Sequence, residues 1–220
     1  KYIAYFQAYT NTYAPVEYLR KIFTEALAHP SVVALSIGTR PDCLGEDVLD
    51  LLNELNQRKP VWVELGLQTM HEESAQIIHR GYDLACFERA VSGLRSRKMD
   101  VIVHTILGLP GEGRKEVLQT IDYLNHMDIQ GIKLQLLHIL KGTDLLTYYE
   151  RHPFYTFTLD DWLERKEFAD GIGRNNYYID VHKKDAKHFP RYKKGESHGI
   201  PFSCLTPVKL ENVLVAGRCI

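Results

Sequence analysis

Cysteine is scarce and scattered in this chain of 220 residues. The four cysteines, Cys43, Cys86, Cys204 and Cys219, form no CxxC pair and show none of the spacings that bind zinc or an iron–sulfur cluster. A free cysteine is among the most buried residue types. The sequence therefore predicts reduced, mostly buried thiols and no metal site.

An excess of charge and a long apolar run are also missing. Lys and Arg number 27 and Asp and Glu number 28, which excludes a bulk electrostatic attraction to nucleic acid or to an anionic membrane. The apolar stretches are well short of the roughly 20 residues of a bilayer helix, and the N-terminal residues lack a signal-peptide pattern. We expect a cytoplasmic protein that recognises a small-molecule or macromolecular substrate through a local site.

The glycine motifs of common nucleotide-binding folds are absent as well. Residues 104–116, HTILGLPGEGRKE, lack the Gly-Lys-Ser/Thr ending of a Walker loop and do not match GxGxxG. They still follow an apolar run and precede a helical pattern, so Gly108, Pro110 and Gly111 are expected to form a turn that brings backbone close to a ligand. A purely structural turn explains this segment, taken alone, equally well.

What the sequence does contain is a regular alternation of apolar runs and amphipathic helical patterns. Most of the runs are continuously apolar, which is typical of strands covered on both faces. Their alternation about every 30 residues predicts a parallel α/β array rather than an α+β fold. Strands are expected at residues 2–7, 32–38, 61–68, 101–108 and 131–139, and helices at 15–29, 45–58, 72–81, 84–98 and 114–127.

Polar residues recur at or near the ends of all five predicted strands. Parallel α/β folds bind their ligands at the carboxyl ends of strands. Each residue alone could be an ordinary loop or barrel-lumen residue, but recurrence on every strand favours a binding site. The residues are Gln7, Thr39, Arg40, Asp42, Glu64, Gln68, Thr69, His104, Gln135 and His138.

The βα period ends near Asp170, after which Gly, Asn, His, Lys and Pro are frequent. We expect a boundary between Trp162 and Asp170, followed by a small, irregular, β-rich C-terminal unit. His182, His188 and His198 have no ligand spacing and are predicted to be solvated loop residues. The chain starts without Met and ends just after a predicted strand, so we expect it to be part of a larger protein.

Five segments together carry a family resemblance: YFQAYTNTYAP, LSIGTRPDCL, VWVELGLQT, HRGY and HTILGLPGE. In this order and spacing they resemble the radical S-adenosylmethionine (SAM) enzymes, in particular the subgroup of the Elongator catalytic subunit and the oxygen-independent coproporphyrinogen oxidases. The resemblance covers roughly residues 1–160. It implies a partial TIM-type (βα) barrel, of which a domain at residues 1–162 supplies strands two to six.

The same resemblance implies cofactors and site residues. SAM would bind beside a [4Fe-4S] cluster for radical hydrogen abstraction from a substrate that the sequence does not identify. The implied SAM-binding residues are Gln7 at the methionine end, Glu64 and Gln68 at the ribose, Arg80 at the carboxylate, and His104, Gly108, Pro110 and Gly111 beside ribose and adenine. The family's cluster cysteines lie after its first strand, and none of the four cysteines here replaces them, so we expect no SAM cleavage by this chain alone. No catalytic residue is assigned.

The C-terminal residues resemble a different family. GIPFSCLTPVKLENVLVAGRCI and the upstream FADGIGRNNYYIDVH are similar to the end of FAD-dependent oxidoreductases, over residues 163–220. The residues implied to lie near the flavin are Ile200, Pro201, Ala216, Gly217 and Arg218. Joining two incomplete families near Trp162 favours a spliced, mis-assembled or engineered chain. A flavin-dependent oxidoreductase fragment and a non-catalytic scaffold are the alternatives to a radical SAM core.

Overall fold

A computed structural model describes residues 1–154, 171–175 and 198–201. The chain divides into two compact units, Lys1–Phe154 and Tyr155–Ile220, and each is considered by itself. The expected domain boundary at residue 162 lies outside the described residues, as do Ala216, Gly217 and Arg218.

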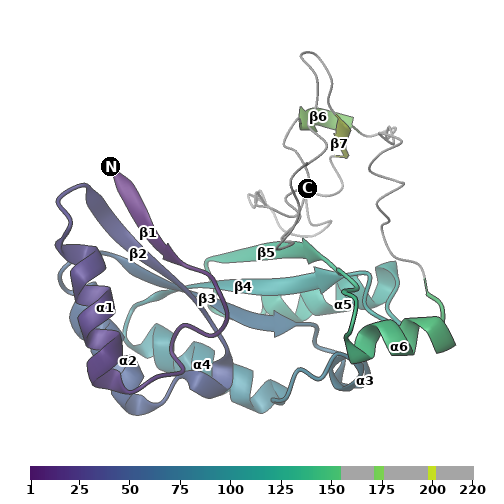
Figure 1. Ribbon diagram of the computed structural model, residues 1–220, viewed down its shortest axis with the longest axis horizontal. Coiled ribbons are helices and arrows are strands. Elements are labelled where there is room, and N and C mark those ends of the chain that lie inside the picture. The colour runs from purple at the N-terminus through teal and green to yellow at the C-terminus, as the bar shows by residue number, and fades with distance from the viewer. Residues whose placement is uncertain (155–170, 176–197, 202–220) are drawn as a thin grey trace. The chain divides into compact units, whose positions relative to one another are not determined.

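The first unit is built on a five-stranded parallel sheet whose spatial order follows the order of the chain. Because each crossover returns to the neighbouring strand, the sheet curls in one direction, as in a barrel, instead of reversing at a switch point. Figure 1 shows the resulting half-barrel, which confirms the predicted partial TIM-type fold. The strands are β1 (Tyr2–Phe6), β2 (Val32–Thr39), β3 (Val61–Gln68), β4 (Asp100–Leu107) and β5 (Gly131–Leu136).

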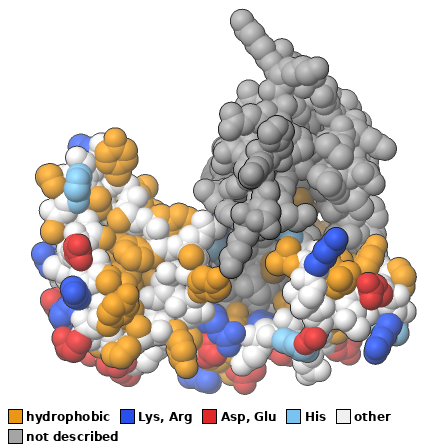
Figure 2. All heavy atoms as spheres, in the orientation of Figure 1, with side chains coloured by type: hydrophobic (Ala, Val, Ile, Leu, Met, Phe, Trp, Pro, Cys, Tyr) orange, Lys and Arg blue, Asp and Glu red, His pale blue; other side chains and the backbone are white. Residues whose placement is uncertain are grey.

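The helices predicted from the sequence form between these strands, and Figure 1 shows α1, α2, α4 and α5 on one side of the sheet. Figure 2 shows acidic and basic side chains intermixed along this helical side. Within the described part of the chain, no helix is long and apolar enough to cross a bilayer. The elements are α1 (Val16–Ala28), η1 (Pro41–Cys43), α2 (Glu46–Asn56), α3 (Glu72–Ile77), α4 (Leu84–Ser96) and α5 (Arg114–Asn125).

One helix was not expected from the sequence. α6 (Asp144–Arg151) follows β5 and begins at Thr143, whose hydroxyl accepts a hydrogen bond from the backbone N–H of Leu146. None of its residues is buried. The sequence did carry two signals for this short helix: Leu145, Leu146, Tyr148 and Tyr149 repeat at helical spacing, and Thr143 is a capping residue.

The core lies between the sheet and the helices that cover it. Along β3 the side chains of Val61, Val63, Leu65 and Leu67 are at most 3% exposed, whereas the alternate positions are largely half-buried. Strand geometry places alternate side chains on opposite faces, so one face of β3 packs into the core and the other is available for polar groups. The largely apolar sequence of the strands therefore does not show that alternate side chains lie on two faces with different roles.

The second unit is described only in part. β6 (Gly171–Asn175) pairs with β7 (His198–Pro201) in an antiparallel arrangement. Ile200 and Pro201, two of the residues implied to lie near a flavin, are in β7. His198, predicted to be a loop residue, instead begins β7, where strand pairing with Asn175 fixes its backbone. His182 and His188 lie outside the described residues.

The packing of α1 against β1 predicts a stability effect. Phe23 is fully buried and meets Phe6 edge-to-face with ring centroids 5.0 Å apart. Phe23→Ala is expected to lower the free energy of unfolding by about 3–5 kcal/mol because it removes this contact and leaves a cavity. Tyr18→Ala, at a 57% exposed position of the same helix, should stay within about 0.5 kcal/mol of the wild type. Denaturant titrations giving equal losses for both variants would contradict this packing.

Candidate functional site

A hydrogen-bonded network lies on the sheet face opposite the helical core, and each of the five strands contributes one residue. Its centre is Glu64, on the middle strand. Glu64 Oε2 accepts hydrogen bonds from Tyr5 Oη, His104 Nε2 and Lys133 Nζ, each at 2.8 Å, and Glu64 Oε1 accepts one from Ser36 Oγ at 2.8 Å. We call these five residues the Glu64 network.

One contact of the Glu64 network joins the two edge strands. Lys133 on β5 donates to Tyr5 Oη on β1 at 2.8 Å, and its ammonium lies 5.1 Å from the centre of the Tyr5 ring. Since β1 and β5 are the outermost strands of the sheet, this contact runs across the concave face. It therefore cross-links the two edge strands of the curled sheet.

The network keeps its central ion pair charged at neutral pH. Burial acts to raise the pKa of Glu64, but the hydrogen bonds from His104, Lys133, Tyr5 and Ser36 outweigh it and hold that pKa well below its usual value. Burial likewise acts to lower the pKa of Lys133, yet its hydrogen bonds to Glu64 and Tyr5 leave it raised. The carboxylate and the ammonium stabilise each other's ionised forms.

This arrangement bears on the roles expected for Glu64 and His104. In the structure Glu64 Oε2 and His104 Nε2 lie 2.8 Å apart. An ionised carboxylate offers about four acceptor positions, and Glu64 already accepts four hydrogen bonds. A ribose hydroxyl would have to replace one of these donors, so the ribose contact of Glu64 stays a prediction.

A cavity of about 640 Å³ opens at the carboxyl ends of the strands. Gln68 and Arg80, both expected at the SAM site, lie on its wall. The cavity also receives side chains from the ends of β2 and β4, from the segment after β5 and from the start of α6. Its other described lining residues are Arg40, Ile77, Ile78, His79, Tyr82, Ile106, Leu137, His138, Leu140, Gly142, Thr143, Asp144 and Leu145.

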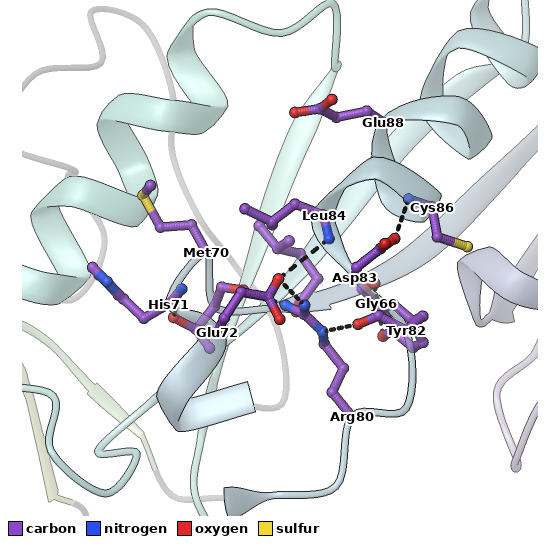
Figure 3. Close-up of polar contacts among 12 residues, drawn as sticks. Gly66, Met70, His71, Glu72, Arg80, Tyr82, Asp83, Leu84, Cys86 and Glu88 are labelled. Atoms are coloured by element: carbon purple, nitrogen blue, oxygen red, sulfur yellow. Dashed lines mark hydrogen bonds and ion pairs between the residues drawn. The ribbon is translucent and has the colours of Figure 1, made fainter. Parts of the chain in front are cut away.

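Arg80 is held rigidly in this wall, with its side chain 1% exposed. Its Nη2 donates to Glu72 Oε1 at 2.6 Å, its Nε to the Tyr82 carbonyl at 2.8 Å, and its Nη1 to the Thr69 carbonyl at 2.8 Å. Figure 3 shows the guanidinium between Glu72 and Tyr82, where Glu72 also accepts from the backbone N–H of Leu84. Arg80 therefore ties the end of β3 to α3 and to the start of α4, and its role at a ligand carboxylate stays a prediction.

A second arginine lies beside the first. Arg40 forms a two-point ion pair with Asp42, at 2.9 and 2.6 Å, and its guanidinium lies 5.1 Å from the centre of the Tyr82 ring. Arg80 approaches the same ring at 5.2 Å. Burial raises the pKa of Tyr82 to about 12, against the opposing effect of the two arginines, so its hydroxyl stays protonated. The cavity wall thus presents two cations around one aromatic ring.

Gln68 has an unusual backbone conformation. It lies at the end of β3 with φ at 69°, where the register with β4 shifts between Gly66 and Gln68. A residue with a side chain rarely adopts this left-handed conformation, and such strain is concentrated at functional sites. The shift aims the Gln68 side chain at the cavity end of the sheet.

The glycine turn has the geometry that its sequence predicts. Gly108 and Gly111 adopt positive φ angles of 82° and 78°, and the Pro110 carbonyl accepts a hydrogen bond from Ser74 Oγ at 3.2 Å. The turn residues do not belong to the described lining of the 640 Å³ cavity. The contacts of Gly108, Pro110 and Gly111 with adenine stay predictions, as does the role of Gln7, which is exposed just after β1.

Several residues of the site were missed or undervalued from the sequence. The sequence pattern indicates Arg40 and His138 only as polar residues at strand ends, and it does not single out Tyr5, Ser36 or Lys133. Lys133 carried a signal, because it stands inside an apolar strand two positions before Gln135 and therefore on the same face.

The described residues hold no group of three or more His, Cys, Asp or Glu side chains arranged to bind a metal ion. Cys43 and Cys86, the two described cysteines, are free thiols and half-buried. The described part of the chain therefore does not fit a [4Fe-4S] cluster, which needs thiolate ligands.

The Glu64 network predicts a pH-dependent stability. Glu64→Gln leaves Lys133 without its buried counter-charge, so the free energy of unfolding at neutral pH should fall by about 3–5 kcal/mol. Because the folded pKa of Glu64 is depressed, its contribution is complete above the unfolded pKa and is lost as pH falls through the folded pKa. The difference between wild type and variant should therefore shrink on acidification.

Denaturant titrations across acid pH measure this effect. Glu54→Gln is the control, because it removes a carboxylate that pairs with Arg20 at the exposed surface, where ion pairs contribute little. Equal losses in the two variants, or a loss in Glu64→Gln that does not change with pH, would contradict the role of the network.

Comparison with known proteins identifies the family. The family model of the Radical SAM superfamily matches residues 1–124, and that of the FAD dependent oxidoreductase family matches residues 153–220. The Bacillus subtilis (strain 168) protein YtqA is 49% identical over 164 residues, which cover 74% of this chain and 51% of YtqA. The chain spans about half the length of the curated relatives it matches.

Solved structures agree on the fold. Elp3 of the archaeon Methanocaldococcus infernus, with an N-terminal deletion, superposes with a TM-score of 0.60 at 20% identity, covering 70% of this chain and 41% of that one. Coproporphyrinogen III oxidase (HemN) of Escherichia coli, a radical SAM enzyme, gives a TM-score of 0.54 at 17% identity, covering 70% and 36%. At these sequence identities the likeness to solved structures concerns the fold alone. The family assignment rests instead on the superfamily model, whose match covers more than half of the chain. The chain belongs to the Radical SAM superfamily.

Proposed function

We propose that residues 1–154 are the SAM-binding core of an enzyme that abstracts hydrogen atoms by radical chemistry. The observation that carries the proposal is the 640 Å³ cavity at the carboxyl ends of the parallel strands, lined by Gln68, Arg40 and Arg80. Membership of the superfamily supports SAM as its ligand. The substrate is a separate molecule whose identity these residues do not specify.

The chemistry of the cavity fits SAM. Small-molecule sites of about 300–1,000 Å³ with apolar walls and a few directed polar groups bury most of a ligand of this size. Ile77, Ile106 and Leu137 offer apolar surface to an adenine ring. The partly exposed guanidinium of Arg40 can donate a hydrogen bond to a carboxylate, and an amide side chain such as Gln68 can bind ribose hydroxyls.

The residues of this chain would bind and orient the cofactor. SAM, when bound and reduced, supplies a 5′-deoxyadenosyl radical. Gln68 would hold the ribose. Arg40 pairs with Asp42 through Nε and Nη2, and its Nη1 has no hydrogen bond among the described residues, whereas all three guanidinium nitrogens of Arg80 are bonded. Arg40, which is also the more exposed of the two, would therefore meet the carboxylate more readily than Arg80.

An iron–sulfur cluster is not part of this binding site, because the described residues do not provide its ligands. In the proposal the cluster-binding thiolates belong to residues outside the described part of this chain or outside the chain. Binding of SAM and its cleavage are therefore separate properties that separate experiments can test.

Binding can be tested on the chain itself. Calorimetry is expected to detect a SAM complex, and Gln68→Ala should weaken it at least tenfold, a loss of about 1.4 kcal/mol. Gln76→Ala, which truncates the same residue type at an exposed position of α3, should leave the affinity unchanged. No heat from a folded wild-type chain, or equal affinities for the two variants, would overturn the proposed site.

Cleavage can be tested on an extended chain. A CxxxCxxC loop and its preceding strand, placed before β1, should allow anaerobic reconstitution with iron and sulfide and the formation of 5′-deoxyadenosine under reducing conditions. Replacing the three added cysteines by alanine is the control. If the reconstituted protein carries a cluster and binds SAM but releases no 5′-deoxyadenosine, radical chemistry is not its function.

The flavin alternative concerns only the second unit. It is supported by the match of residues 153–220 to the FAD dependent oxidoreductase model. Ile200 and Pro201 lie in the β6–β7 pair, and the remaining residues implied at a flavin lie outside the described residues. FAD binding therefore stays a prediction of the sequence and is secondary to the SAM proposal.

A further inference from the structure

Three buried polar atoms near the end of β3 have no hydrogen-bond partner in the part of the chain that the structure describes. Among the described residues they are Gln68 Oε1, Thr105 Oγ1 and Glu112 Oε1. Leaving such an atom unsatisfied is energetically costly, so isolated cases are rare in folded proteins. Finding three in one region indicates that they share a partner.

All three side chains line one small cavity. Its volume is about 10 Å³, and it lies between the ends of β3 and β4 and the first turns of α5. A cavity needs roughly 10–15 Å³ of this kind of volume to hold one water molecule, which also needs two to four polar partners. The remaining lining residues are Ile106, Leu107, Val117, Thr120 and Ile121.

The donors and acceptors match a single water molecule. Gln68 Oε1 and Glu112 Oε1 can only accept hydrogen bonds when Glu112 is ionised, and the Thr105 hydroxyl can donate one. A water molecule donates two hydrogen bonds and accepts from a third group. A cation would need about six oxygen ligands, and most of the remaining wall is apolar.

We propose that this cavity binds one ordered water molecule, which links Glu112 and Thr105 to Gln68. The water would donate to the two Oε1 atoms and accept from Thr105 Oγ1. Glu112 and Thr105 are then positioning residues for Gln68. Neither lies among the described residues that line the 640 Å³ cavity.

The water molecule would fix the orientation of the Gln68 amide, with Oε1 toward the small cavity and Nε2 toward Gly66 and Tyr82. Gln68 lines both the small cavity and the 640 Å³ cavity. Its Nε2 lies over Gly66, only 2.9 Å from where a Cβ atom would stand, and beside the Tyr82 hydroxyl. With Oε1 held by the water, the amide cannot rotate, and the strained backbone of Gln68 gains a further restraint.

The water itself can be detected without any ligand. In the full chain with labelled threonine methyl groups, the Thr105 methyl should show a nuclear Overhauser effect with a long-lived water molecule. Thr12 is the control, because it is equally buried but its hydroxyl already bonds to Thr39 and to the Cys43 carbonyl. A water signal at neither methyl, or equal signals at both, would overturn the proposed water site.

The positioning role rests on the proposed function, because it is measured through SAM affinity. Glu112→Leu should weaken SAM binding about tenfold, and Glu112→Gln, which keeps an amide oxygen, should restore most of it. In a Gln68→Ala background, Glu112→Leu should have no further effect, because its influence passes through Gln68. Additive losses would overturn the positioning role.

These outcomes distinguish the two proposals. If the wild-type chain binds no SAM, the proposed function fails while the methyl experiment still decides whether the water is present. If SAM binds but the Thr105 methyl shows no water signal, the water site fails and the SAM site stands.

Discussion

The half-barrel of the first unit depends on one carboxylate. Glu64 stands on the middle strand and accepts hydrogen bonds from side chains of the four other strands, so its charge joins all five strands across the concave face of a sheet that the strand order already curls. The buried pair with Lys133 is costly to break because each charge would then lie unpaired in a poorly solvated space. The curl that results brings the carboxyl ends of the strands around a common space.

The candidate site forms in this common space, and hydrogen bonds and ring contacts hold the side chains of its wall in place. Arg80 fastens the end of β3 to α3, and Tyr82 lies against both Arg80 and Arg40. Gln68 is held in a strained conformation between Gly66 on one side and the small cavity with Glu112 on the other. Such preorganisation suits a site that must fix a flexible cofactor in one orientation.

Much of this could be predicted from the sequence, because periodicity reports on burial. The five strands and the helices that cover them followed from apolar runs alternating with helical patterns, and Gly108 and Gly111 marked a turn that requires positive φ. The Glu64 network could not be found in this way, because its members are 128 residues apart at the extreme and meet only once the sheet curls. The internal bonding of Arg80 and the strain at Gln68 are likewise tertiary effects that no local pattern encodes.

The central claim is that the cavity at the strand ends binds SAM, and a residue-resolved titration tests it most directly. Backbone amide spectra of the full chain recorded with increasing SAM should shift at Gln68, Arg40 and Ile106, which line the cavity, and stay unchanged at Glu54 on the outer face of α2. Shifts confined to other parts of the chain, or none at saturating SAM, would contradict the account.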